Sequence, residues 1–192
     1  MLQLDTAFIG AVAGIVALIA YIPYFVAILR RQTKPNRATW WIWAIVDGLA
    51  LESYQAVGAT NTLWVPAVFF FGSLVVALMS LRYGEKGWHK LDKWCLGLAS
   101  VSIVVRFVFK EPFFALCLNL FILMLGALPT IRKSWTDPAG EDKLAWTLFL
   151  VCCIINMFAI DKWNFEKAGL PIYALVTDII IVVFLLLPRK KN

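Results

Sequence analysis

Long apolar runs alternate with short charged breaks along the 192-residue chain. Each run is close to the ~20 residues that an α-helix needs to cross ~30 Å of hydrocarbon. Within the runs Leu, Ile, Val, Ala and Phe follow one another almost continuously, without the apolar–polar alternation of barrel strands. The pattern predicts an all-α, polytopic membrane protein with seven transmembrane helices, over residues 7–29, 40–59, 63–81, 92–109, 112–131, 144–161 and 167–187.

Positive charge is concentrated in the breaks on one side of the predicted membrane. Fourteen of the 18 Lys and Arg residues fall there, within Arg30–Arg37, Arg82–Lys93, Arg132–Lys143 and Arg189–Lys191. Three fall on the other side, and Arg106 lies inside the fourth run, where it can reach the headgroups. By the positive-inside rule the N-terminus is outside and the C-terminus cytoplasmic, in a plasma (inner) membrane. Most of the nine tryptophans fall near run ends, as in an aromatic belt.

The net charge of +6 does not indicate a nucleic-acid partner, because the cations are spread over membrane-proximal segments and interleaved with acids. Membrane lipid is the expected partner of Arg30–Arg37. Enzyme, metal and cofactor sites find no support: the single histidine, His89, lies in a loop, so none at membrane depth can activate Ser73. The four cysteines lie within apolar runs and are expected to be packing residues rather than disulfides.

Two triplets of predicted helices repeat the spacing of their prolines and tryptophans. The corresponding pairs are Pro23 with Pro129 and Trp40 with Trp146, at an offset of 106, and Pro66 with Pro171, at an offset of 105. This predicts a 3+1+3 arrangement with a first three-helix bundle in residues 1–82, a cytoplasmic loop and linker helix in 83–110, and a second bundle with a short tail in 111–192. The single linker helix inverts the chain and leaves the two bundles parallel.

The sequences that follow Pro23 and Pro129 are also similar to each other. Pro23 is followed by the basic loop RRQTKPNR and a Trp-rich run, and Leu128-Pro129 is followed by IRKSW and DPAGEDK. With the 3+1+3 pattern, these features resemble the SWEET and PQ-loop superfamily of membrane transporters, whose architecture the KDEL receptors share. Tyr24 and Thr130 stand where the PQ motif has glutamine. The resemblance implies that Pro23 and Pro129 act as gating kinks; the alternative is a bend without a moving part.

Two aspartates lie near the middle of predicted spans. Asp47 is ~12 Å from the inner boundary of its span and Asp178 ~14 Å from that of its own, at ~1.5 Å per residue. An acid at this depth is costly, by at least ~2.5–3.5 kcal/mol, so it faces a cavity or a partner. The resemblance implies a solute-facing polar residue on the third helix of each triplet, here Ser73 and Asp178. The residues predicted to line a solute site are Trp43, Asp47, Tyr54, Ser73, Asn119, Asn156 and Asp178.

These features predict a carrier that moves a small polar solute by alternating access. A desolvated acid at Asp178 would allow coupling to protons or recognition of a cationic group. The structural alternatives are interhelical hydrogen bonds for Asn119 and Asn156, and a protonated or paired acid for Asp178. The competing function is a non-transporting membrane receptor or assembly subunit of the same architecture, in which Arg106 is the cation nearest the membrane interior.

Overall fold

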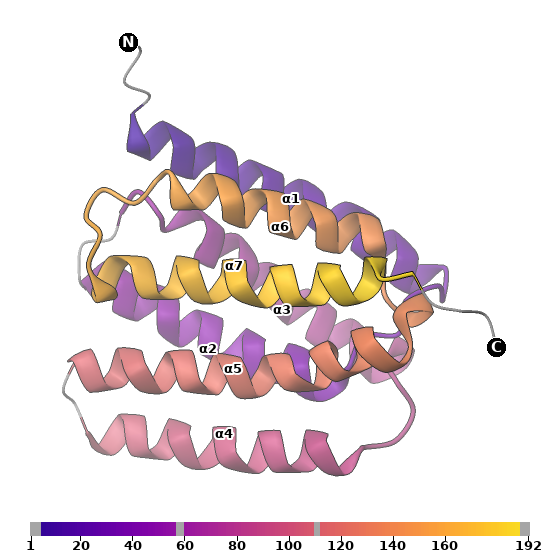
Figure 1. Ribbon diagram of the computed structural model, residues 1–192. Coiled ribbons are helices and arrows are strands. Elements are labelled where there is room, and N and C mark those ends of the chain that lie inside the picture. Colours follow the sequence, from indigo (N-terminus) through magenta and orange to yellow (C-terminus); the bar gives the residue numbers. More distant parts are fainter. Residues whose placement is uncertain (1–4, 57–59, 110–111, 189–192) are drawn as a thin grey trace.

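The computed structural model describes residues 5–56, 60–109 and 112–188. Lys110 and the basic tail 189–192, which entered the charge count, lie outside these ranges. Within them the chain forms seven α-helices and one short 3₁₀-helix (Figure 1). The helices are α1 (Thr6–Leu29), α2 (Arg37–Ala56), α3 (Trp64–Tyr83), α4 (Lys90–Val108), α5 (Pro112–Thr136), η1 (Pro138–Gly140), α6 (Lys143–Met157) and α7 (Phe165–Leu186).

Four of the described helices are long and apolar enough to cross a membrane. They are α1, α3, α5 and α7, whose most apolar stretches have a mean hydropathy between 2.1 and 2.4. α6 is also apolar but has 15 residues, fewer than the expected run 144–161. Large apolar side chains point outward along several helices; Leu18, Phe71 and Val104 are 60–63% exposed. Such an outer surface suits contact with lipid rather than water, as expected of a helical integral membrane protein.

Six of the helices pack in a ring, with α4 outside it. We call α1–α3 the first triplet and α5–α7 the second. α3 packs against both α1 and α2, and α7 packs against both α5 and α6. The triplets meet where α1 contacts α6 and where α2 contacts α5, and α4 lies against α5 (Figure 1). The third helix of each triplet therefore lies between the other two, and all six helices can reach the centre of the ring.

Two of the helix ends that differ from the expected runs lie beside buried polar side chains. α2 begins at Arg37 rather than residue 40, since Asn36 Oδ1 accepts the N–H of Thr39 at 3.1 Å and caps the helix. α5 continues to Thr136, beyond the expected end at residue 131. Its last turns include Lys133, which is buried among polar partners instead of being solvated.

α1 and α3 approach closely at Gly72, which fixes an aromatic ring at the centre of the molecule. A Cβ atom at position 72 would lie 2.0 Å from Cζ of Tyr21, so a larger residue would displace the ring. The Tyr21 hydroxyl donates to the carbonyl of Phe69 at 3.4 Å. The hydroxyl end of the Tyr21 ring is thereby held against α3.

Candidate functional site

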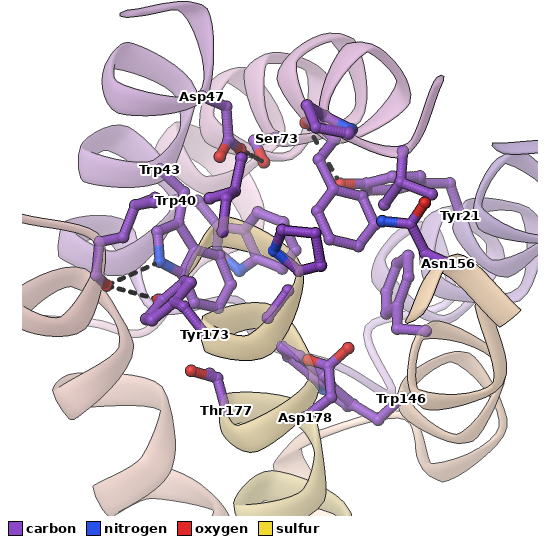
Figure 2. A pocket seen from close by; sticks show the side chains of 18 residues that line it. Tyr21, Trp40, Trp43, Asp47, Ser73, Trp146, Asn156, Tyr173, Thr177 and Asp178 are labelled. Atoms are coloured by element: carbon purple, nitrogen blue, oxygen red, sulfur yellow. Dashed lines mark hydrogen bonds between the residues drawn. The ribbon is translucent and has the colours of Figure 1, made fainter. Parts of the chain in front are cut away.

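The six helices of the ring enclose a central cavity (Figure 2). It has about 60 Å³ of room for the centres of water molecules. The cavity therefore has room for several waters or a small solute. Among the described residues, the lining comes from α1, α2, α3, α5, α6 and α7, and none comes from α4.

Most of the side chains predicted to form a solute site meet in this cavity. Those that line it are Trp43, Asp47, Ser73, Asn156 and Asp178. Asn119 is buried in α5 but is not part of the lining. The side chains of Tyr54 and Arg106 lie outside the described residues. The structure thus brings five of the predicted residues together, while their part in solute binding stays a prediction.

Corresponding positions of the two triplets build much of the lining. An offset of 106 relates α2 to α6 and one of 105 relates α3 to α7, as for the tryptophans and prolines in the sequence. Six pairs of lining residues obey these offsets: Trp40 and Trp146, Trp43 and Phe149, Val65 and Leu170, Pro66 and Pro171, Phe69 and Ala174, Ser73 and Asp178. The repeat in the sequence is therefore also a repeat in the wall of the cavity.

Each buried carboxyl accepts a hydrogen bond from the neighbouring helix of its triplet. Ser73 Oγ on α3 donates to Asp47 Oδ2 on α2 at 2.9 Å. Cys153 Sγ on α6 donates to Asp178 Oδ2 on α7 at 3.3 Å. At the offsets above, Asp47 corresponds to Cys153 and Ser73 to Asp178. Both triplets therefore have an acid–donor pair at the same two positions, but the acid lies on α2 in the first triplet and on α7, the counterpart of α3, in the second. Spacing along the chain does not distinguish Cys153 from the other cysteines, because its role depends on the contact between α6 and α7.

The cavity holds acidic side chains without a basic one. Asp47 and Asp178 are 7% and 5% exposed. None of the described lining residues is Lys, Arg or His. A neutral hydroxyl and a neutral thiol are weak compensation for a buried negative charge, because they supply single hydrogen bonds and no opposite charge.

Aromatic rings form the inner part of the wall and contact one another across the triplets. The ring centroids of Tyr21 and Phe149 are 4.8 Å apart, and their planes are steeply inclined. Trp40 meets Trp43 at 5.3 Å and Trp146 at 6.3 Å. These separations are those of favourable edge and tilted contacts. The cluster joins α1 and α2 to α6 immediately beside the cavity.

Some polar atoms of the lining are held by the backbone and others are not. Trp43 Nε1 and the Tyr173 hydroxyl both donate to the carbonyl of Leu123, at 3.2 and 2.7 Å. Asn156 Oδ1 and Trp40 Nε1 are buried and have no hydrogen-bond partner among the described residues. A buried polar atom without a partner costs about 1–3 kcal/mol, so each is a candidate contact for a solute or water. Figure 2 shows Asn156 extending from α6 toward the cavity.

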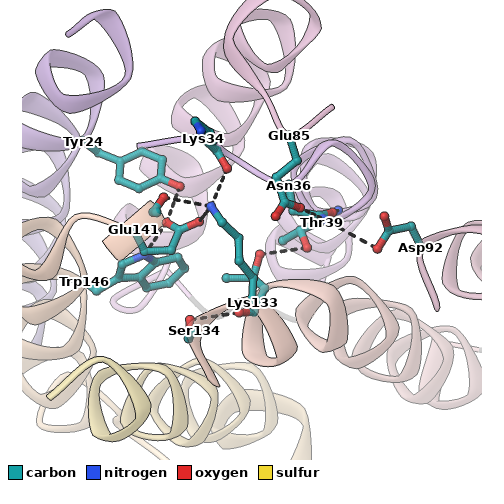
Figure 3. A network of polar contacts seen from close by, with 12 residues as sticks. Tyr24, Lys34, Asn36, Thr39, Glu85, Asp92, Lys133, Ser134, Glu141 and Trp146 are labelled. Atoms are coloured by element: carbon teal, nitrogen blue, oxygen red, sulfur yellow. Dashed lines mark hydrogen bonds and ion pairs between the residues drawn. The ribbon is translucent and has the colours of Figure 1, made fainter. Parts of the chain in front are cut away.

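A buried polar network closes the predicted inner end of the ring (Figure 3). Lys133 Nζ on α5 lies 2.6 Å from Glu141 Oε1, and also donates to the carbonyls of Lys34 and Gly140. The other oxygen of Glu141 accepts from the Tyr24 hydroxyl at 2.9 Å and from the Trp146 indole at 3.0 Å. We call this set of contacts the inner network; its members are Tyr24, Lys34, Lys133, Gly140, Glu141 and Trp146.

Sequence reasoning did not find this network. From the sequence, Lys133 is one of the cations of the predicted inner side, and Glu141 is an acid in a predicted loop. Their buried ion pair forms because η1 (Pro138–Gly140) turns the chain back between α5 and α6. The clue in the sequence is an acid eight residues after a lysine, across a Pro-Ala-Gly turn.

The residues directly after the two predicted gating prolines connect the triplets. Pro23 lies inside α1 and Pro129 inside α5. Tyr24 joins the first triplet to the second through its bond to the inner network. Thr130 Oγ1 on α5 donates to Thr39 Oγ1 on α2 at 2.9 Å. The positions where the PQ motif has glutamine thus form hydrogen bonds between triplets at both of their interfaces.

Eight of the nine tryptophans fall into two groups, and the ninth, Trp41, is half-buried against the core. Five are 44–71% exposed, as belt residues are: Trp64, Trp88, Trp94, Trp135 and Trp163. Trp40, Trp43 and Trp146 instead line the cavity. Trp43, predicted to line the solute site, lies in the cavity wall. Trp40 and Trp146 differ from the belt expectation, because their indoles pack on one another between helices rather than facing lipid.

Comparisons with protein families, with curated proteins and with solved structures find no match to this chain. Within the described residues, no group of three or more His, Cys, Asp or Glu side chains gathers as a metal site would require. The four cysteines form no disulfide. Functional conclusions therefore rest on the cavity and its surroundings.

Proposed function

We propose that this protein is a membrane carrier for a small polar solute, working by alternating access between two parallel three-helix bundles joined by the linker helix α4. The observation that carries the proposal is the central cavity, which combines two buried acids with unpartnered polar atoms inside a shell of apolar helices. A cavity of mostly apolar lining with a few placed polar groups is the usual form of a small-molecule site. The positive-inside count supports a cytoplasmic C-terminus.

The repeated construction of the wall supports movement of one triplet against the other. Carriers built from repeats commonly hold the solute at the repeat interface and open first to one side and then to the other. In this structure the inner network and the Thr130–Thr39 bond tie the triplets together on the predicted cytoplasmic side. The conformation described here is thus the inside-closed one, and inward opening breaks these bonds beside Pro23 and Pro129.

The buried acids support coupling to protons within this proposal. A carboxylate without a cation beside it is costly at membrane depth, so each acid holds a proton when no positively charged solute is present. The titratable groups facing the two acids are the hydroxyls of Tyr21 and Tyr173 and the thiol of Cys153. None of these supplies positive charge, so protons and solute compete for Asp47 and Asp178.

Two features favour a carrier over the receptor and assembly alternatives. A purely structural subunit has no use for a cavity with unpartnered polar atoms at the centre of its helices. A receptor for a peptide carboxylate needs a cation in its pocket, and the described lining has none.

The test begins with purified full-length protein in detergent and a panel of small polar solutes. A solute that binds the folded state raises the unfolding temperature by mass action. Each stabilising solute is then offered, radiolabelled, to proteoliposomes. We expect time-dependent uptake by the wild type and by S100A, a control on α4 outside the ring. We expect Asp178→Asn to abolish uptake or its dependence on pH. Stabilisation without uptake of any solute would replace the carrier by the receptor alternative, and uptake that ignores pH would refute proton coupling.

A further inference from the structure

The charge of the cavity indicates the kind of solute it accepts. Asp47 and Asp178 are nine-tenths or more buried, and the described lining contains no Lys, Arg or His. Two acids in such a place are stable as anions only when something positive accompanies them. The described lining does not provide that charge, so the solute is the remaining source besides a proton.

The aromatic wall suits the same kind of solute. Trp40, Trp43 and Trp146 lie within 5.3–6.3 Å of one another beside the acids, and Tyr21 and Phe149 continue the cluster. Aromatic faces attract ammonium groups, most strongly when water is excluded, and indole is the strongest of them. Carboxyls and aromatic rings around one cavity thus provide both charge and a surface for an apolar body.

A third observation concerns hydrogen bonding. Asn156 Oδ1 is an acceptor with no partner among the described residues, on a side chain that is 3% exposed and lines the cavity. It extends toward the space enclosed by the six helices (Figure 2). An acceptor there calls for a solute with N–H or O–H donors. A quaternary ammonium has none, whereas a protonated amine has up to three.

We infer that the cavity binds a small organic amine in its protonated form. Its ammonium group donates to Asn156 and to the carboxylates of Asp47 or Asp178, and its hydrocarbon part packs on the tryptophans. A free amino acid is excluded, because its carboxylate would enter an acidic cavity without a cation to meet it. The size of the cavity limits the solute to a small molecule in this conformation. The inference names the solute class of the carrier proposed above and rests on the same cavity.

The experiment compares three molecules that differ only at the charged end: isobutylamine, isobutanol and valine. Valine is isobutylamine with a carboxylate added, and isobutanol replaces the ammonium by a neutral hydroxyl. The thermal unfolding of the full-length protein is followed against the concentration of each. We expect saturable stabilisation by isobutylamine, with the other two binding about tenfold more weakly or not at all, since a desolvated cation contact is worth at least that factor. Equal stabilisation by isobutanol or by valine, or none by isobutylamine, overturns the inference.

The comparison of the three molecules uses the wild-type protein alone. Variants then test whether the amine binds in the central cavity. Asp178→Asn and Asn156→Leu are expected to weaken isobutylamine binding by about tenfold, and S100A to leave it unchanged. Unweakened binding in a folded protein that carries both Asp47→Asn and Asp178→Asn places the amine elsewhere and also overturns the inference.

Failure of the inference is distinguishable from failure of the carrier proposal. If isobutylamine binds but is not taken up by proteoliposomes, the inferred solute class stands and the carrier proposal is refuted. If a neutral solute is taken up and isobutylamine does not inhibit that uptake, the carrier proposal stands and the inferred solute class is refuted.

Discussion

Substituting Gln for Glu141 removes the negative charge beside a buried lysine. Lys133 Nζ lies 2.6 Å from Glu141 Oε1, and the two side chains are 2% and 0% exposed. Removing one partner of a buried ion pair costs about 3–5 kcal/mol, because the other charge is left uncompensated. Gln keeps an oxygen that can accept from Tyr24 and Trp146, but its NH2 group then faces Lys133 and cannot accept. The substitution therefore removes the charge together with the hydrogen bond from Lys133 to Oε1. We expect E141Q to lower the free energy of unfolding by about 3–5 kcal/mol.

The chain contains a matched control for this measurement. Lys167 Nζ and Asp161 Oδ2 are 2.7 Å apart, but their side chains are 15% and 37% exposed. Exposed pairs contribute about 0–1 kcal/mol, so D161N is expected to change the free energy of unfolding by no more than about 1 kcal/mol. The assay is reversible unfolding in mixed micelles, followed by tryptophan fluorescence, for the two variants and the wild type.

A double variant completes the cycle. K133M/E141Q removes the buried cation as well as the anion, so it is expected to be more stable than E141Q alone. The reasoning is refuted if E141Q costs no more than D161N, or if K133M in the E141Q background restores nothing. Either result would mean that the inner network does not hold a desolvated charge pair.

Three further expectations follow from the same contacts. Tyr24→Phe and Thr130→Val each remove a bond between triplets, so hydrogen exchange at the inner ends of α1 and α5 should quicken; unchanged exchange would mean that these bonds do not hold the inner end closed. Gly72→Val places side-chain atoms against the Tyr21 ring, so it should lower the free energy of unfolding by about 1–3 kcal/mol and also weaken solute binding. Stability and binding equal to those of the wild type would contradict the close approach of α1 and α3. The hydrogen bond from Lys167 lowers the pKa of Asp161, so this pair's small contribution is present at neutral pH and lost as pH falls through that lowered pKa. D161N should abolish that part of the pH dependence of unfolding, and a D161N profile identical to the wild type would contradict it.

The sequence predicts what depends on local spacing. Continuous apolar runs identify helices because no other backbone form satisfies its own hydrogen bonds in lipid. The interval between Trp43 and Asp47 places both on one helical face, and both line the cavity. The position of Asp178 seven residues after Pro171 likewise predicts its alignment with Ser73 after Pro66.

Other features depend on contacts between distant segments and could not be read from spacing. Lys133 looks like an ordinary inner-side cation until the chain folds back and buries it against Glu141. Cys153 looks like a packing residue, yet it is the hydrogen-bond donor to Asp178. Asn119 lies at a suitable depth in its helix but is not part of the cavity lining, because depth does not fix which way a helix face turns.

Access to the cavity from both sides of the membrane is the most direct test of the carrier proposal. Ser73→Cys places a thiol in the lining at nearly unchanged size, and a small membrane-impermeant methanethiosulfonate is applied to oriented vesicles from either side, with the wild type as the background for the native cysteines. We expect labelling from outside and, more slowly, from inside, with faster inside labelling in the Tyr24→Phe background. Labelling from one side alone in both backgrounds would contradict alternating access and leave a binding protein that moves nothing.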